Sequence, residues 1–107
     1  MRASVADRGV LLGGLSERDW QRRVVDYATW CGWLSYHTHD SRRSEPGFPD
    51  LVLLRRDRCV VAELKSDVGK VTTAQQRWLD AFAVVPGLEV HVWRPADCWP
   101  TVQETLR

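Results

Sequence analysis

Residues 49–65, PDLVLLRRDRCVVAELK, contain two four-residue apolar runs separated by the polar stretch 55–58. The two runs have the pattern of neighbouring β-strands, and the polar stretch has that of a hairpin turn. A turn of two or four residues would place Asp50 directly opposite Glu63, whereas an odd-length turn would move one of them to the other face of the sheet. The sequence therefore predicts a β-hairpin whose register decides whether these two carboxylates meet.

Asp50, Glu63 and Lys65 form a candidate metal site at one end of this hairpin. Facing residues on paired strands have Cβ atoms about 4.5 to 5.5 Å apart, so the two carboxylates can hold one hard divalent cation, with the Leu64 carbonyl as a further oxygen ligand. Lys65 shares a face with Glu63 because it lies two residues further along. Carboxylates that hold Mg²⁺ or Mn²⁺ can activate water, neutralise phosphoryl oxygens and assist the leaving alkoxide in phosphodiester hydrolysis. The residues alone leave two interpretations open, a catalytic metal site and a structural ion pair.

Length and composition indicate one intracellular globular domain. The 107 residues include 15 Lys and Arg against 14 Asp and Glu, so any basic surface for nucleic acid must be local, at residues 22–23, 42–43 or 55–58. The three cysteines are widely spaced in apolar surroundings, which predicts buried reduced thiols and disfavours a zinc cluster. No segment reaches the ~18 apolar residues of a membrane span, so we expect no membrane contact and a cytoplasmic location. Most of the six tryptophans recur at core-type spacing, which favours packing over base stacking.

Apolar periodicity predicts an α/β fold with the element order α-β-β-β-α-β-α. Residues 1–15 show no periodicity and are expected to form a flexible tail, and residues 16–107 the domain. Both faces of the hairpin strands are apolar, which indicates a mixed sheet covered by helices on both sides. The expected elements are a helix from Ser16 to Gly32, a strand at 33–37, the two hairpin strands, a helix from Thr72 or Thr73 to Pro86, a strand at 88–93 and a helix from Pro95 to near Leu106.

The ordered set of these motifs resembles the PD-(D/E)XK nuclease superfamily, and in particular the small stand-alone VRR-NUC (virus-type replication-repair nuclease) proteins of phages and bacteria. The resemblance covers nearly everything from residue 16 onward, and it is specific because the motifs keep their order and spacing. One departure is Thr73, where relatives often have proline, and it touches only the start of a helix. The matching stretches are Ser16-Glu17, Gly32-Trp33, Gly47 to Val52, Glu63-Leu64-Lys65, Thr72 to Gln75, Trp78-Leu79 and Val92 to Pro95.

This resemblance implies a restriction-endonuclease-like core and assigns roles to five side chains. Asp50 and Glu63 match metal ligands, and Lys65 matches the catalytic lysine. Glu17 matches the helix-borne acid that completes the metal site, although an acid in the first turn of a helix is also a simple partner for the helix dipole. Gln75 matches a glutamine placed near the lysine or the metal-bound water, and a solvated side chain is the alternative.

The polar loop after the first strand is a candidate DNA-binding segment. A His-x-His pattern at 37–39 is weak support for zinc, because zinc needs further ligands and the loop adds only carboxylates. In a nuclease, His39, Arg42, Arg43 and Ser44 would border the active cleft, with the arginines holding phosphates rather than reading bases. A mobile polar loop without a partner is the alternative for each residue taken singly.

The resemblance further implies a Mg²⁺- or Mn²⁺-dependent DNA endonuclease that cuts branched DNA, with four-way junctions as the leading substrate. It also implies a homodimer, because one small domain with one site must pair to cut a junction twice. Two other functions stay open, a nicking or restriction-type nuclease acting on duplex or single-stranded DNA and a catalytically silent DNA-binding module of the same fold. The presence of Asp50, Glu63 and Lys65 disfavours the silent module.

Overall fold

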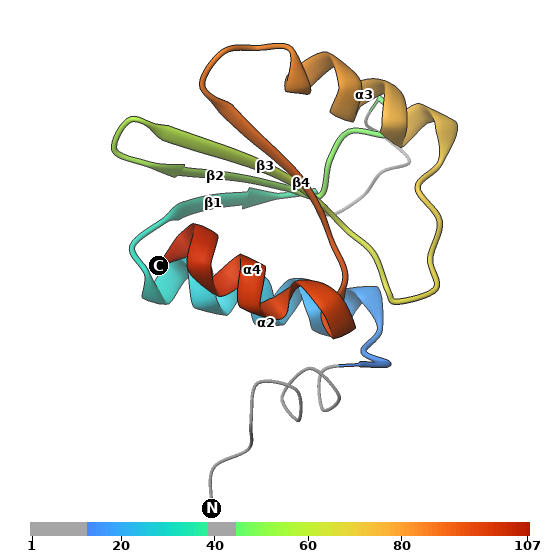
Figure 1. Cartoon of the computed structure of the whole chain (residues 1–107), viewed down its shortest axis with the longest axis horizontal. Coiled ribbons are helices and arrows are strands. Elements are labelled where there is room, and N and C mark those ends of the chain that lie inside the picture. The colour runs from blue at the N-terminus through green and yellow to red at the C-terminus, as the bar shows by residue number, and fades with distance from the viewer. Residues whose placement is uncertain (1–12, 39–44) are drawn as a thin grey trace, which may run out of the picture.

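A four-stranded mixed sheet lies at the centre of the structure, a computed structural model that describes residues 13–38 and 45–107. The strands lie in the order β1-β2-β3-β4, with two antiparallel pairs followed by a parallel one, and helices lie on both sides of the sheet (Figure 1). The predicted α/β class and element order are confirmed. Within the described ranges, no helix is both long and apolar enough to cross a membrane. The elements are α2 (Glu17–Trp30), β1 (Leu34–His37), β2 (Leu51–Arg55), β3 (Arg58–Leu64), α3 (Thr73–Ala83), β4 (Leu88–Trp93) and α4 (Pro95–Leu106).

Strands β2 and β3 form the predicted hairpin, and its turn has an even length. Arg55 pairs with Arg58, so only Arg56 and Asp57 lie between the strands. Arg56 has a positive φ of 57°, the backbone conformation that two-residue hairpin turns with the correct twist require. The register continues to the last paired residues at the other end of the hairpin, and one step further it brings Asp50 beside Glu63.

One face of the sheet is covered by α2 and α4, which together with the strands form the hydrophobic core (Figure 1). The buried side chains of this core include four of the six tryptophans, which confirms packing as the role of most of them. Two tryptophans differ, because Trp30 is 86% exposed and Trp78 on α3 is half-buried. The core comprises Trp20, Val24, Ala28, Trp33, Leu51, Leu53, Val60, Ala62, Leu64, Trp93, Trp99, Val102 and Leu106.

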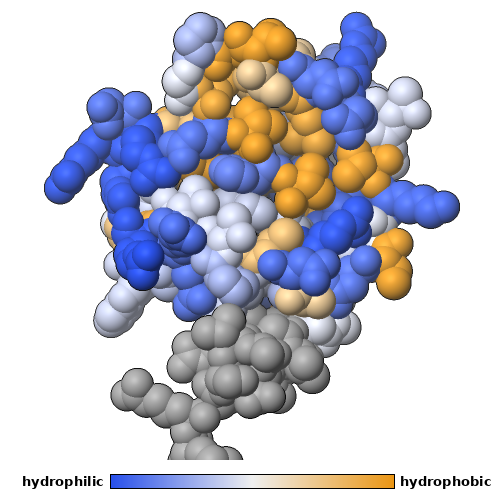
Figure 2. Space-filling model, viewed as in Figure 1, coloured by the Kyte–Doolittle hydropathy of each residue, from blue (hydrophilic) through white to orange (hydrophobic). Residues whose placement is uncertain are grey.

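Helix α3 covers the other face only in part. It contacts β4 most, and on the side seen in Figure 2 hydrophobic residues reach the surface over and beside α3. At the opposite edge of the sheet, Leu34, Tyr36 and Leu54 are 73%, 62% and 46% exposed. The predicted cover on both faces is therefore incomplete, because the single helix on this face is too narrow to reach β1.

Arg55 and Arg58 do not form the basic surface that their sequence spacing made possible. Arg58 donates two hydrogen bonds of 2.6 and 2.8 Å to the Glu89 carboxylate, which lowers the pKa of Glu89. Arg55 donates to the carbonyl of Leu106 at 3.1 Å, and both guanidinium groups lie over the Trp33 ring. These two arginines therefore tie the hairpin to the C-terminal helix and to β4.

The three cysteines are free thiols, as expected, but they are not buried. Cys31, Cys59 and Cys98 are each partly exposed. They lie at the end of α2, near the start of β3 and in the first turn of α4, so each is at an element end rather than in the centre of the core. The prediction of buried cysteines was therefore wrong, because apolar neighbours in sequence do not place a residue inside.

The described end of the predicted N-terminal tail contacts the domain. Leu15 packs against the core, and the Gly14 amide donates a 2.7 Å hydrogen bond to Asp67. Residues 1–12 lie outside the described ranges. The boundary between tail and domain at residues 15 and 16 stays a prediction.

Candidate active site

The five side chains with predicted catalytic or metal-binding roles line one cavity of about 400 Å³. They come from four separate parts of the fold, which are the start of α2, the residue before β2, the end of β3 and the first turn of α3. The structure therefore brings together residues that are up to 58 positions apart in the sequence. These residues are Glu17, Asp50, Glu63, Lys65 and Gln75.

Asp50 and Glu63 form the carboxylate pair that the hairpin register predicts. Asp50 is held by the Leu64 amide, which donates a 2.8 Å hydrogen bond to its Oδ2 atom. Glu63 is 1% exposed, and its Oε1 atom accepts a 3.2 Å hydrogen bond from Gln75 Nε2. The second oxygen of Glu63, Oε2, is buried and has no hydrogen-bond donor. A buried carboxylate oxygen without a hydrogen-bond donor costs free energy, so this oxygen is expected to have a further partner, such as a cation, in the functional protein.

Burial raises the pKa of Glu63 to about 9, and the neighbouring Asp50 carboxyl contributes in the same direction. Lys65 opposes this shift, but it is too distant to compensate for the burial. Its Nζ atom lies 3.9 Å from the nearest oxygens of both Glu63 and Glu17, which is beyond hydrogen-bond range. The cavity therefore contains more acidic than basic groups, and the Lys65 ammonium group lies between Glu63 and Glu17.

Gln75 has two roles that its spacing from Thr72 makes possible. Its backbone amide donates to the Thr72 hydroxyl and its side-chain oxygen accepts from the Thr72 amide, which together form a complete capping box for α3. The same side chain donates its Nε2 hydrogen to Glu63. A solvated Gln75 side chain is thus excluded, because both ends of the amide are bound. The helix cap and the carboxylate orientation depend on one residue.

The donor set fits a hard divalent cation. In residues 13–38 and 45–107, no group of three or more His, Cys, Asp and Glu side chains is placed to hold a metal ion. The carboxylates nearest one another are those of Asp50 and Glu63, and the Glu17 carboxylate lies beside the Lys65 ammonium group instead. Mg²⁺ is commonly held by only one or two protein carboxylates and keeps several waters. A cation would also supply the positive charge that the buried Glu63 lacks. Closed four-ligand sites of the structural zinc type do not match this arrangement.

A tight contact at Gly47 fixes the cavity wall, and neither spacing nor periodicity in the sequence predicts this contact. Gly47 has a φ of +87°, and a Cβ atom there would lie 2.5 Å from the Ala74 carbonyl oxygen and 2.7 Å from the Gln75 amide nitrogen. The loop before β2 therefore packs backbone against backbone on the first turn of α3. This contact holds Asp50 and Gln75 in one site.

Gly47→Ala is expected to destabilise the protein by about 2 to 6 kcal/mol, because a positive φ costs about 1 to 3 kcal/mol and overpacking a similar amount. Gly87→Ala is the matched control, since Gly87 has a φ of +84° and no atom within 4 Å of the added Cβ. We expect this control to lose only the cost of the positive φ, about 1 to 3 kcal/mol. Urea unfolding of both variants measures the difference. Equal losses would show that the contact with α3 carries no energy.

A second set of contacts holds the backbone at Lys65 and in the segment that follows it. The Lys65 amide donates to the Trp93 carbonyl at 3.1 Å, and Arg94 Nη1 donates to the carbonyls of Ser66 and Gly69. A Cβ atom at Gly69 would lie 3.2 Å from Glu17 Oε1 and 3.5 Å from the Lys65 side chain. Arg94 therefore holds the segment after β3 closely against the two charged side chains of the site, a role that its position in the sequence does not predict.

The predicted DNA-binding residues His39, Arg42, Arg43 and Ser44 lie outside the described residues, so their role stays a prediction. The residues on either side of that segment, Thr38 and Glu45, both line the candidate cavity. The Thr38 amide donates to the Asp50 carbonyl at 3.1 Å, which fixes the start of the segment beside the carboxylate pair.

Comparisons with known proteins agree with this fold. The family model of the VRR-NUC domain matches residues 7–96. A solved structure described as a VRR_NUC domain protein has 21% sequence identity and a TM-score of 0.63, and the alignment covers 87% of this chain and 88% of that one, which shows a shared fold. No curated protein matches the chain. Because the domain match spans most of its length, the chain belongs to the VRR-NUC domain family, which is nuclease-like.

Proposed function

We propose that this VRR-NUC domain is a divalent-metal-dependent DNA endonuclease of the PD-(D/E)XK type. The observation that carries the proposal is the buried Glu63 carboxylate, which adjoins Asp50 and has one oxygen without a donor. A folded protein keeps such a costly group when it has a use, and perturbed carboxylates in a cavity are typical of functional sites. The nuclease-like family supports DNA as the substrate.

Each side chain of the cavity has a role in this proposal. Asp50 and Glu63 would hold Mg²⁺ or Mn²⁺, with the Leu64 carbonyl and Glu17 as further oxygen ligands. The cation supplies charge neutralisation at the phosphodiester and promotes ionisation of water. Lys65, whose ammonium lies 3.9 Å from two carboxylates, orients the attacking water or stabilises the negative charge that develops on the phosphoryl oxygens. Gln75 holds Glu63 in place through its 3.2 Å hydrogen bond.

The acidic character of the cavity also supports metal dependence. Glu17, Glu45, Asp50 and Glu63 line it, and among the described lining residues Lys65 is the sole cation. Without a cation, the scissile phosphate alone would be repelled from this cavity, and a bound divalent cation reverses the local charge there. His39, Arg42, Arg43 and Ser44 are proposed to hold the DNA backbone beside it.

The proposed substrate is branched DNA, with four-way junctions first. Purified protein would be incubated with labelled four-way junction, linear duplex and single-stranded DNA, each in Mg²⁺, Mn²⁺ or EDTA. We expect metal-dependent products and the fastest cleavage on the junction. Equal or faster cleavage of linear duplex or single strands would favour a nicking or restriction-type nuclease. Failure to cut any of the DNAs in metal would leave a DNA-binding module and contradict the enzyme.

Two copies of the chain are proposed to pair, because a junction requires two cuts and the family model matches one VRR-NUC domain in each chain. The exposed Leu34, Tyr36 and Leu54 support this pairing. Strand register places them on the same face of the sheet as Asp50 and Glu63, so pairing there would set two sites near one another.

Leu34→Glu is expected to convert a two-chain particle into single chains, because a charge at the centre of an apolar contact is costly to bury. Light scattering after size-exclusion chromatography measures the mass. Val68→Glu is the control, since Val68 is 89% exposed and lies on the segment after β3 instead. Wild-type protein with the mass of one chain would contradict the pairing, and an unchanged Leu34→Glu mass would contradict this surface.

A further inference from the structure

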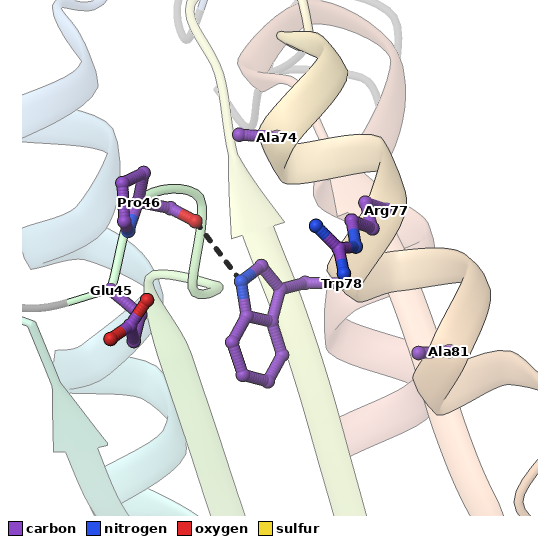
Figure 3. A pocket seen from close by; sticks show the side chains of 6 residues that line it. All are labelled: Glu45, Pro46, Ala74, Arg77, Trp78 and Ala81. Atoms are coloured by element: carbon purple, nitrogen blue, oxygen red, sulfur yellow. Dashed lines mark hydrogen bonds between the residues drawn. The ribbon is translucent and has the colours of Figure 1, made fainter.

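A second cavity, of about 420 Å³ (Figure 3), shares lining residues with the candidate active site. Its size lies within the range of small-ligand sites. It is lined by Glu45, Pro46, Ala74, Arg77, Trp78 and Ala81, and the first three of these also line the active-site cavity. The two cavities therefore share a wall between the 45–46 segment and the first turn of α3. A linear polymer bound in one cavity can therefore extend directly into the other.

Trp78 is fixed in a single orientation in this second cavity. Its indole Nε1 atom donates a 3.0 Å hydrogen bond to the Pro46 carbonyl, as Figure 3 shows. The ring packs edge-on against Phe48, with centroids 5.1 Å apart at 74°, and lies 6.0 Å from Phe82 at 31°. Because the ring remains half-buried rather than covered, it offers an aromatic surface that is already ordered. Ordering such a group in advance removes a cost of binding.

The remaining lining supplies one positive charge, from Arg77, and one negative charge, from Glu45. Arg77 projects from α3 next to Trp78 (Figure 3), and it is the sole cationic side chain among the residues that line this cavity. An arginine beside a partly exposed aromatic ring matches the chemistry of a nucleotide, with the base against the ring and the phosphate on the guanidinium. Ala74 and Ala81 line the same cavity with short side chains.

We propose that this second cavity binds one unstacked nucleobase of the DNA strand next to the cleaved phosphodiester. The base stacks on Trp78, and Arg77 contacts a flanking phosphate. This inference rests on the proposed DNA endonuclease function and specifies its substrate. Removing a base from a duplex costs a few kcal/mol, and the cost is least where the base is already unpaired. The Trp78 cavity would thus favour branch points and single strands over intact duplex.

The first test measures binding in EDTA, where no cutting is expected. DNA with a branch point would carry the fluorescent base 2-aminopurine at successive positions around the branch. Wild-type protein is expected to quench the probe at one position. Trp78→Leu is expected to abolish that quenching and to weaken binding about tenfold, because the stacking contact between the base and the aromatic ring is lost. Trp30→Leu, which removes an 86% exposed tryptophan elsewhere, should behave as wild type. Equal quenching by Trp78→Leu would overturn the inference.

Two further variants keep the test valid if Trp78→Leu does not fold. Trp78→Phe retains an aromatic ring and should retain most of the quenching. Ala81→Glu places a bulky anion in the cavity at an exposed helix position and should abolish quenching without touching Trp78. Quenching that survives in Ala81→Glu would contradict the proposed location.

The second test uses cleavage and separates this inference from the nuclease proposal. In Mn²⁺, one abasic nucleotide would be moved through the positions flanking the cut. We expect wild-type cleavage to fall about tenfold at one position, and Ala81→Glu to cut intact and abasic DNA at the same low rate. No sensitive position in an active enzyme would overturn the base site alone. Quenching in EDTA with no cleavage in metal would overturn the nuclease while leaving the base site standing.

Discussion

In EDTA at pH 8, Glu63→Gln is expected to be about 2 to 4 kcal/mol more stable than the wild-type protein, and in Mn²⁺ to cut DNA at least about 10³-fold more slowly. Both effects arise from the same buried carboxylate. Glutamine keeps the shape of the side chain and can still accept the hydrogen bond from Gln75. The glutamine side chain cannot ionise. Its neutral amide is a poorer ligand for a hard cation than the carboxylate that it replaces.

The sign of the stability effect follows from the pKa of Glu63, which burial raises from an ordinary 4.5 to about 9 in the folded protein. A group with a raised folded pKa binds its proton more tightly in the native state than in the unfolded state. Its contribution to stability is fully present below about pH 4.5 and is lost as the pH rises through about 9. Metal-free wild-type protein should therefore lose stability across this window relative to Glu63→Gln, and the two should converge near pH 4.5.

Urea unfolding at pH 5 and pH 8 measures this difference, with Glu104→Gln on the exposed side of α4 as the control. Adding Mn²⁺ should then stabilise the wild-type protein, because a ligand that binds only the native state raises its stability, and should leave Glu63→Gln unchanged. A destabilised Glu63→Gln in EDTA would show that Glu63 is a structural ion-pair partner. Equal stabilisation of both proteins by Mn²⁺ would place the metal elsewhere.

Replacing Lys65 by methionine is expected to slow cleavage by about 10² to 10³-fold while DNA binding in EDTA changes little. The magnitude is that of removing one group that stabilises developing charge in a water-poor site. Lys65 is 6% exposed, and methionine preserves most of its buried hydrocarbon chain while removing the ammonium group between Glu63 and Glu17. The loss should appear in kcat rather than in KM, because the interaction forms in the transition state.

Lys70→Met is the matched control for this change. Lys65 and Lys70 are the two lysines of the chain, and Lys70 is exposed on the connection to α3. Single-turnover cleavage rates of the two variants, with unfolding curves to verify that each is folded, measure the effect. Similar rates in both variants would show that Lys65 takes no part in the chemistry and serves only as a structural ion-pair partner.

The hairpin and its carboxylate pair could be predicted from sequence because their geometry is local. The apolar runs predict the hairpin, and a side-chain period of two makes Asp50 face Glu63 for any even-length turn. The turn length itself was left open by the sequence, and the structure shows that it is two residues. The geometry at Gln75 is also local, because its spacing from Thr72 is that of a capping box. Its hydrogen bond to Glu63 adds a contact that spacing alone does not reveal.

The supporting contacts could not be predicted, because they join segments that only the folded topology brings together. Gly47 looks like an ordinary turn glycine, and the backbone of α3 against it is visible only in three dimensions. Arg94 lies in a short motif after β4 but holds the segment after β3. Apolar strand faces likewise do not tell whether a helix of the same chain or another molecule covers them, as the exposed Leu34 shows.

Cleavage of a labelled four-way junction by Asp50→Asn and wild-type protein, side by side in Mn²⁺ and in EDTA, tests the metal-dependent site most directly. Asp50 is the partner of Glu63 in the pair, and asparagine keeps an oxygen that can still accept the hydrogen bond from the Leu64 amide. We predict rapid product formation by the wild-type protein in Mn²⁺, none in EDTA, and at least about 10²-fold slower cleavage by folded Asp50→Asn. Mn²⁺-dependent cleavage at the wild-type rate by Asp50→Asn would contradict the assignment of the active site.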